Sequence, residues 1–296
     1  MSDANTIVQL SASEKLLLVE TKATCPFLAG AVNESKLPVR NTANDPLASI
    51  EDVRALGNTG GGDLGDLLVF FASGNHAFMR GESGKLDKEV PAGLFSLELP
   101  GSQGSHPGHS GILQGDPALP GSGRLSATDF MRLTSRATNG YLKRSDVGRF
   151  IGENLFNDPH AKVFWETTGA LLSSGVDFVQ TTGAALMSKL FDSDDETETT
   201  HRDVEQKLTK LLGVDNLVGS AGEFGLLFAF LVNKPGTQEI DDEPTISVQD
   251  LTAMFVDKRL PDGWETWKKS RLDWIKNTTA LLISARKEYF LLKRKQ

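Results

Sequence analysis

Apolar residues recur three and four positions apart along most of this chain, which is the spacing of amphipathic helices. Ser126 or Thr128 can cap one such segment, and another starts after Ser145. We expect helices over 26–36, 50–57, 64–72, 126–137, 146–156, 161–191, 204–213, 221–233, 247–261 and about 264–293. The pattern therefore predicts a mostly α-helical protein.

One long segment breaks this pattern. Residues 81–124 contain ten glycines and five prolines, a density that excludes a long helix. Irregular stretches of this length are uncommon in compact domains and usually carry function or are disordered. This one includes short apolar runs and two of the five histidines. We therefore expect an ordered, functional loop region here, and a solvated linker in the acidic stretch 191–203.

Composition narrows the class of protein. The net charge is −8, from 31 basic against 39 acidic residues, so the chain lacks the basic field that nucleic-acid binding needs. The first residues lack the basic and apolar regions of a secretory signal. No apolar run is long enough to span a membrane, and for the basic tail at 293–295 a docked terminal helix is favoured over membrane contact. We expect a cytoplasmic protein, or one released without a standard signal.

Cys25 is the only cysteine, which excludes an intrachain disulfide framework and a zinc site with several cysteines. Pro26 follows it, and proline is favoured at the first position of a helix. Cys25 would then be the N-cap, with its sulfur at the positive end of the helix dipole, where a thiol pKa is lowered. A buried spare thiol, a nucleophile, a redox sensor and a soft-metal ligand all remain open on these grounds.

The segment that begins at Cys25 resembles the proximal segment of the haem-thiolate peroxidases, the chloroperoxidases and unspecific peroxygenases. Their pattern is Pro-Cys-Pro, a helix carrying an Asn, and then Leu-Pro with a nearby Arg. The positions in register here are Cys25, Pro26, Leu28, Asn33, Leu37 and Pro38. Thr24 replaces the first proline, and Arg40 comes one place late.

Two further blocks are similar to the same family. The first is a helix with an acid–base Glu, followed by a block ending in Gly-Trp; it is matched by Glu223, Phe255, Arg259, Leu260, Pro261, Gly263 and Trp264. The second is the family's acidic triplet, of which Gln114-Gly115-Asp116 keeps two residues out of three. The resemblance reaches from about residue 23 to 266. It implies a single-domain helical bundle around a haem over these residues. The residue pattern adds long Gly/Pro-rich loops, a lead-in over 1–22 and a C-terminal helix over 267–296, packed on the domain or a partner.

The resemblance also implies roles for particular residues. Cys25 would be the axial ligand of haem b iron, with Pro26 and Asn33 in the cofactor-binding segment. Glu223 would be the catalytic acid–base, and its apolar neighbours favour a raised pKa. The alternative interpretation is a carboxylate near a helix N-terminus that complements the helix dipole. His109 is the first choice for the catalytic partner of Glu223, ahead of His106 and Arg149. Asp116 and Gln114 would lie at a possible Mg²⁺ or other cation site near the haem.

These implications lead to an expected enzyme. It would use hydrogen peroxide to oxidise or oxygenate a small organic substrate, with no nucleic-acid partner. A non-catalytic haem-binding or interaction protein on the same scaffold is the alternative, because Gln114 lacks the charge of the family's Glu. In a third hypothesis, the chain is a helical interaction protein whose partner surface includes residues 265–296.

Overall fold

The structure of the protein is a computed structural model. It describes residues 5–23, 25–69, 93–97, 112, 115–116, 119–120, 125–158 and 216–296. The expected helices over 161–191 and 204–213, the linker over 191–203 and most of the Gly/Pro-rich region lie outside these residues. Helix is the dominant structure in the described part. The helices with defined bounds are α1 (Ala12–Leu17), a π-helical turn η1 (Leu18–Lys22), α2 (Pro26–Asn33), α3 (Ile50–Gly57), the short η2 (Thr59–Gly61), α5 (Ala127–Thr134), α6 (Arg144–Asn157), α11 (Asn216–Leu231), α12 (Val248–Phe255) and α13 (Arg271–Lys293). Residues 65–69, within the expected helix over 64–72, are also helical.

Three small antiparallel sheets accompany the helices. Their strands are β1 (Arg40–Asn41), β2 (Pro46–Ser49), β3 (Leu94–Ser96), β4 (Gly115–Asp116), β5 (Leu119–Pro120), β6 (Tyr141–Lys143), β7 (Glu239–Ile240) and β8 (Glu243–Ser247). The strand orders are β1-β2-β3, β4-β5 and β6-β8-β7. The sequence pattern did not predict them, because strands of two to five residues are too short to show an alternation.

Local capping explains several helix boundaries. The Ser126 hydroxyl accepts a hydrogen bond from the Asp129 amide at the start of α5, as expected for an N-cap. Ser247 caps α12 in the same way, through the Asp250 amide. The helix expected over 50–57 is confirmed as α3, which Ser49 caps. The helix expected over 26–36 ends at Asn33, and Ser35 adopts a positive φ of 59°.

The N-terminal segment, within the expected lead-in over 1–22, is attached to the main hydrophobic cluster. Ser11 and Glu14 form a reciprocal capping box at the start of α1. Leu18 and Val19 of η1 are buried in the main hydrophobic cluster, and the Val8 amide donates to the Val39 carbonyl. These two apolar side chains anchor residues 5–23 in the core.

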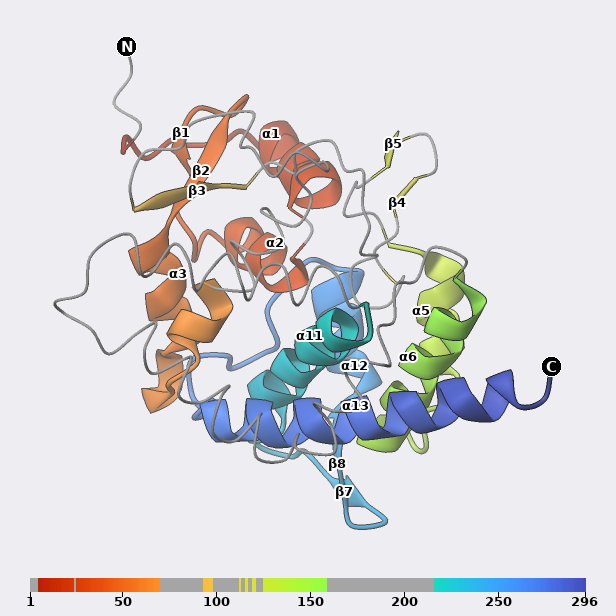
Figure 1. Cartoon of the computed structure of the whole chain (residues 1–296). Coiled ribbons are helices and arrows are strands. Elements are labelled where there is room, and N and C mark those ends of the chain that lie inside the picture. The colour runs from red at the N-terminus through yellow and green to blue at the C-terminus, as the bar shows by residue number, and fades with distance from the viewer. Residues whose placement is uncertain are drawn as a thin grey trace, which may run out of the picture.

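The C-terminal helix α13 crosses α6 and α11 along one side of the molecule (Figure 1). The Trp274 indole donates to the Gly222 carbonyl of α11, and the Ser284 hydroxyl donates to the Ser145 carbonyl of α6. The helix begins at Arg271, with Ser270 as its N-cap, and not near residue 264 as predicted. Residues 264–270 instead form an irregular segment held by turns and by buried side chains.

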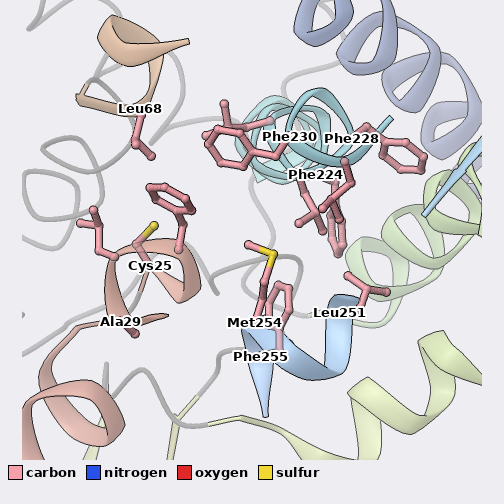
Figure 2. Close-up of a cluster of buried hydrophobic side chains, with 14 of the residues drawn as sticks. Cys25, Ala29, Leu68, Phe224, Phe228, Phe230, Leu251, Met254 and Phe255 are labelled. Atoms are coloured by element: carbon pink, nitrogen blue, oxygen red, sulfur yellow. The ribbon is translucent and has the colours of Figure 1, made fainter. Parts of the chain in front are cut away.

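The core lies between α2, α11, α12 and α6, with further residues from η1, α3, α5 and α13. Figure 2 shows part of it, where side chains from α2, α11 and α12 converge on Cys25 and Leu68. The described residues therefore form a mostly α-helical fold. Within them, no helix combines the length and the apolar character that a membrane span requires.

Candidate functional site

Cys25 occupies the N-cap position of α2, as the sequence predicted. Pro26 is the first helical residue, and the backbone of Cys25 is extended (φ −70°, ψ 114°). Proline at the first position fixes the helix start, because the ring pre-sets φ and no amide hydrogen is needed there. The thiol is buried, with 8% of the residue exposed. The sequence therefore places a sulfur inside the core at the start of a buried helix.

Burial controls the charge of this thiol. It raises the pKa of Cys25 from its ordinary value of 9.0 to about 11. The backbone amides of Phe27 and Leu28 lower this pKa, but neither makes a well-formed hydrogen bond to the sulfur. The expectation that the helix N-terminus would make Cys25 a thiolate is therefore wrong for the chain by itself, because desolvation of the charged form outweighs the helix end.

Glu223 lies on α11, close enough to Cys25 for its negative charge to raise the pKa of the thiol. Only 4% of Glu223 is exposed. Its neighbours along the helix, including Phe224, Leu226 and Phe228, are buried in the hydrophobic cluster. A carboxyl group and a thiol that are far apart in the sequence thus meet in one apolar region.

Figure 2 shows how this region is lined. Cys25 at the start of α2 shares it with Leu68, with Phe224 and Phe230 of α11, and with Met254 of α12. Apart from Cys25 these side chains offer no strong hydrogen-bond donor or acceptor. The surroundings favour neutral groups and exclude water from around the sulfur.

The block after α12, residues 256–265, packs directly on α2. The Asn33 side chain donates from Nδ2 to the Lys258 carbonyl (2.9 Å), and the Leu260 amide donates to Glu34 Oε1 (3.2 Å). A Cβ atom on Gly30 would lie 2.9 Å from the Arg259 carbonyl carbon, so only glycine permits this approach. The two blocks that resemble the peroxidase family therefore form one structural unit. In it the Asn33 amide holds the loop, and its cofactor-binding role stays a prediction.

Aromatic rings extend this unit. The Phe27 ring stacks on Phe230 of α11 (centroids 4.9 Å apart) and contacts Trp264 (4.5 Å). Trp264 in turn meets Phe230 edge to face at 4.9 Å. The Gly-Trp end of the second block therefore rests on the residue two places after Cys25, and it fixes the first turn of α2.

Lys258 is a site residue that the sequence analysis missed. Only 9% of it is exposed, its backbone adopts a positive φ of 51°, and its charge lowers the pKa of Cys25. Burial lowers the pKa of Lys258 itself, while the charges of Glu20 and Cys25 raise it. The signal available in the sequence was its position directly before the matched Arg259-Leu260-Pro261.

The other predicted site residues are placed less fully. His109, His106, Gln114 and the Thr24 that departs from the family pattern lie outside the described residues. Asp116 ends strand β4, with its backbone paired to Leu119 of β5. Arg149 lies on α6, where its half-exposed guanidinium forms an ion pair with Asp146 of the same helix. The partner of Glu223 and the cation site stay predictions.

The described surroundings of Cys25 combine a single sulfur ligand with an apolar lining. Within the described ranges, no three His, Cys, Asp or Glu residues form a group that could hold a metal ion. A buried thiolate can serve as the one protein ligand of an iron whose other ligands come from a porphyrin. The apolar lining would suit the faces of such a ring.

Comparisons with protein-family models, with curated proteins and with solved structures found no match for this chain. The likeness to the haem-thiolate peroxidases therefore depends on the matched motif residues and on where the fold places them.

Proposed function

We propose that this protein is a haem-thiolate peroxidase or peroxygenase, a helical domain built around a haem that uses hydrogen peroxide to oxidise or oxygenate a small organic substrate. One observation carries the proposal. Cys25 and Glu223, the residues that match the family's axial ligand and acid–base, are both buried and interact electrostatically. The fold brings them together although the sequence separates them widely.

Cys25 would bind the iron. Because the pKa of the thiol is about 11 in the chain alone, it would release its proton when a metal cation binds, as thiol ligands generally do. A haem held by a thiolate supplies the cleavage of the peroxide O–O bond. Phe27 and Trp264, packed against the first turn of α2, would keep the sulfur in position.

Glu223 would move the proton. Its carboxylate would accept a proton from one oxygen of the peroxide and return it to the other, which would leave as water, with the electrons for cleavage of the O–O bond supplied by the haem when it is bound. The phenylalanines of α11 would exclude solvent from this transfer.

A non-catalytic haem-binding protein is the second candidate. The observation that favours it is Gln114, which stands where the family has a Glu in its acidic triplet. Such a protein would bind haem through Cys25 and show no peroxide-dependent oxidation of a simple phenol.

The deciding experiment is reconstitution of the full chain with haem, followed by the spectrum of the reduced protein under carbon monoxide. We expect the red-shifted Soret band of a thiolate-ligated haem in the wild type and in Glu223→Gln. Cys25→Ala should lack this band, since the chain has no other cysteine. A wild-type protein that binds no haem, or a Cys25→Ala protein with an unchanged spectrum, would contradict the proposal.

A further inference from the structure

Lys269 is fully buried, with 0% of its surface exposed, in the irregular segment before α13. Its ammonium donates to the carbonyls of Trp264, Trp267 (2.9 Å) and Thr59 (3.4 Å), and to the Thr59 hydroxyl (3.2 Å). All four acceptors are neutral. Within the part of the chain that the structure describes, no carboxylate oxygen lies within ion-pair distance of Nζ, so the positive charge is not neutralised at contact.

The same ammonium lies over two indole rings. Nζ is 4.4 Å from the Trp264 ring centroid and 4.8 Å from that of Trp267, and the two rings meet edge to face at 5.9 Å. A close approach of the chain supports this arrangement. A Cβ atom on Gly60, whose φ is 69°, would lie 2.1 Å from the Trp267 carbonyl oxygen. The glycine lets the Thr59 turn reach Lys269.

The two indoles continue the aromatic cluster that supports Cys25. Trp264 contacts Phe27, which is the second residue of α2. The Trp264 Nε1–H is buried and has no hydrogen-bond acceptor among the described residues, and the Trp267 Nε1–H donates to the Phe230 carbonyl at 2.7 Å. Tryptophan is among the side chains most easily oxidised by one electron. An oxidant formed near Cys25 could therefore oxidise these tryptophans in place of its substrate.

We infer that Lys269 protects Trp264 and Trp267 from one-electron oxidation, so that an oxidant generated from peroxide beside Cys25 acts on the substrate and not on the protein. The inference rests on the proposed function for its purpose. Its physical basis is separate, because it concerns only the charge of the ammonium and the two rings.

The electron and proton balance explains the protection. An indole that gives one electron to the oxidant becomes a radical cation, and the oxidant is reduced by that electron. A fixed positive charge in a buried site opposes the second positive charge on the ring. The radical cation is normally relieved by loss of its Nε1 proton to a base. Trp264 has no acceptor in the described structure, and the Phe230 carbonyl facing Trp267 is a poor base.

The test uses the full chain without haem and an external one-electron oxidant, photogenerated tris-bipyridyl ruthenium(III). Trypsin releases residues 260–268, which contain Trp264 and Trp267, and residues 272–276, which contain Trp274. Mass spectrometry of both peptides measures the rate of oxygen incorporation. We expect Lys269→Met to raise oxidation of the 260–268 peptide severalfold. Trp274, whose indole donates to the Gly222 carbonyl, serves as the internal reference and should be unchanged.

A matched variant separates charge from packing. Thr59→Val removes one acceptor and keeps the ammonium, so it should leave oxidation of the 260–268 peptide close to the wild-type rate. Equal oxidation in Lys269→Met and wild type would overturn the inference. So would a Thr59→Val protein oxidised as fast as Lys269→Met.

A second charge variant covers the case in which Lys269→Met does not fold. The Glu265 carboxylate is the acidic charge that acts on Lys269, and it lies mostly exposed in an ion pair with Lys36 (2.8 Å). Glu265→Gln should slow oxidation of the peptide, because it removes the charge that partly offsets the ammonium. An unchanged or faster rate would contradict the inference. Since none of these arms contains haem, their failure is distinguishable from failure of the proposed function, which the carbon monoxide spectrum decides.

Discussion

Cys25 and Lys269 are two buried ionisable side chains at opposite ends of one aromatic cluster, and the fold treats their charges differently. The Lys269 ammonium has four neutral acceptors and two indole faces, and burial lowers its pKa only to about 8, so it stays mostly charged at neutral pH. The Cys25 sulfur has no well-formed hydrogen bond at the helix cap, and burial raises its pKa to about 11.

The difference teaches what each site needs. A buried charge is stable only when partners replace its water. The chain supplies such partners to the Lys269 ammonium, so this site is complete without a ligand. In the described residues the chain supplies only weak stabilisation to a Cys25 thiolate, so a strong cationic partner such as iron would complete that site. Four predictions test this contrast, beginning with the largest effect.

Glu223→Gln should lower peroxide turnover about 10²–10⁴-fold, the range typical for loss of a general acid–base. Haem binding and the carbon monoxide spectrum should remain. Steady-state oxidation of a phenol, per bound haem, is the measurement. Glu153→Gln is the control, because that carboxylate forms an ion pair with Arg136, has no role in the proposed chemistry and should leave turnover unchanged. Normal turnover in Glu223→Gln would exclude the acid–base role.

Lys269→Met should reduce the free energy of unfolding by about 2–4 kcal/mol, because it removes the ammonium donor from the Trp264 and Trp267 carbonyls. Cys25→Ala in the haem-free protein should cost only about 1 kcal/mol, since the thiol makes no strong polar contact. Urea denaturation followed by circular dichroism measures both. An equal loss in the free energy of unfolding for the two variants would show that the chain does not stabilise the Lys269 site more than the Cys25 site.

The pH dependence of stability should have opposite signs at the two sites. The Cys25 pKa is raised from 9.0 to about 11, so the folded state holds the proton longer and stability falls as pH rises from about 9 to 11. The Lys269 pKa is lowered from 10.5 to about 8, so stability rises between about 8 and 10.5. Each contribution has a limiting slope of about 1.4 kcal/mol per pH unit.

Single variants separate these slopes. Between pH 9 and 10, Cys25→Ala should gain stability relative to wild type as pH rises, and Lys269→Met should lose it. Denaturant midpoints measured across this range, with the variants compared at each pH, give the two differences. Parallel curves for wild type and either variant would contradict the pKa shift at that residue.

Asn33→Ala should give the smallest effect, a loss of about 1 kcal/mol in the free energy of unfolding, because its amide makes one hydrogen bond to the Lys258 carbonyl. Asn233→Ala is the matched control, since its amide bonds to the exposed Asp273 carboxylate and should matter little. Thermal denaturation of the haem-free proteins measures both. An Asn33→Ala protein as stable as wild type would show that this hydrogen bond does not hold the loop on α2.

The sequence correctly predicted where several helices begin. Pro26 placed Cys25 at a helix N-cap, and Ser126 marked the start of α5, because capping depends on residues only a few positions apart. The final helix was placed several residues too early. The spacing of Trp264 and Trp267 is typical of a helix. In the structure their backbone carbonyls instead accept hydrogen bonds from the Lys269 ammonium.

The charge state of Cys25 shows the limit of such reasoning. The sequence indicated the helix N-terminus, which lowers the pKa of Cys25. It did not indicate the burial, which raises the pKa by a larger amount. Lys258 was missed for a similar reason, because its proximity to Cys25 arises from the packing of the loop after α12 against α2.

The sequence by itself determined which short segments are helical and where several of them begin, because those signals are local. It also placed the motif residues in their order along the chain. Only the tertiary structure decided that α2, α11 and the 256–265 block form one unit, with Glu223 beside Cys25 and Trp264 on Phe27. Burial and long-range packing set these relations, and neither is a property of neighbouring residues.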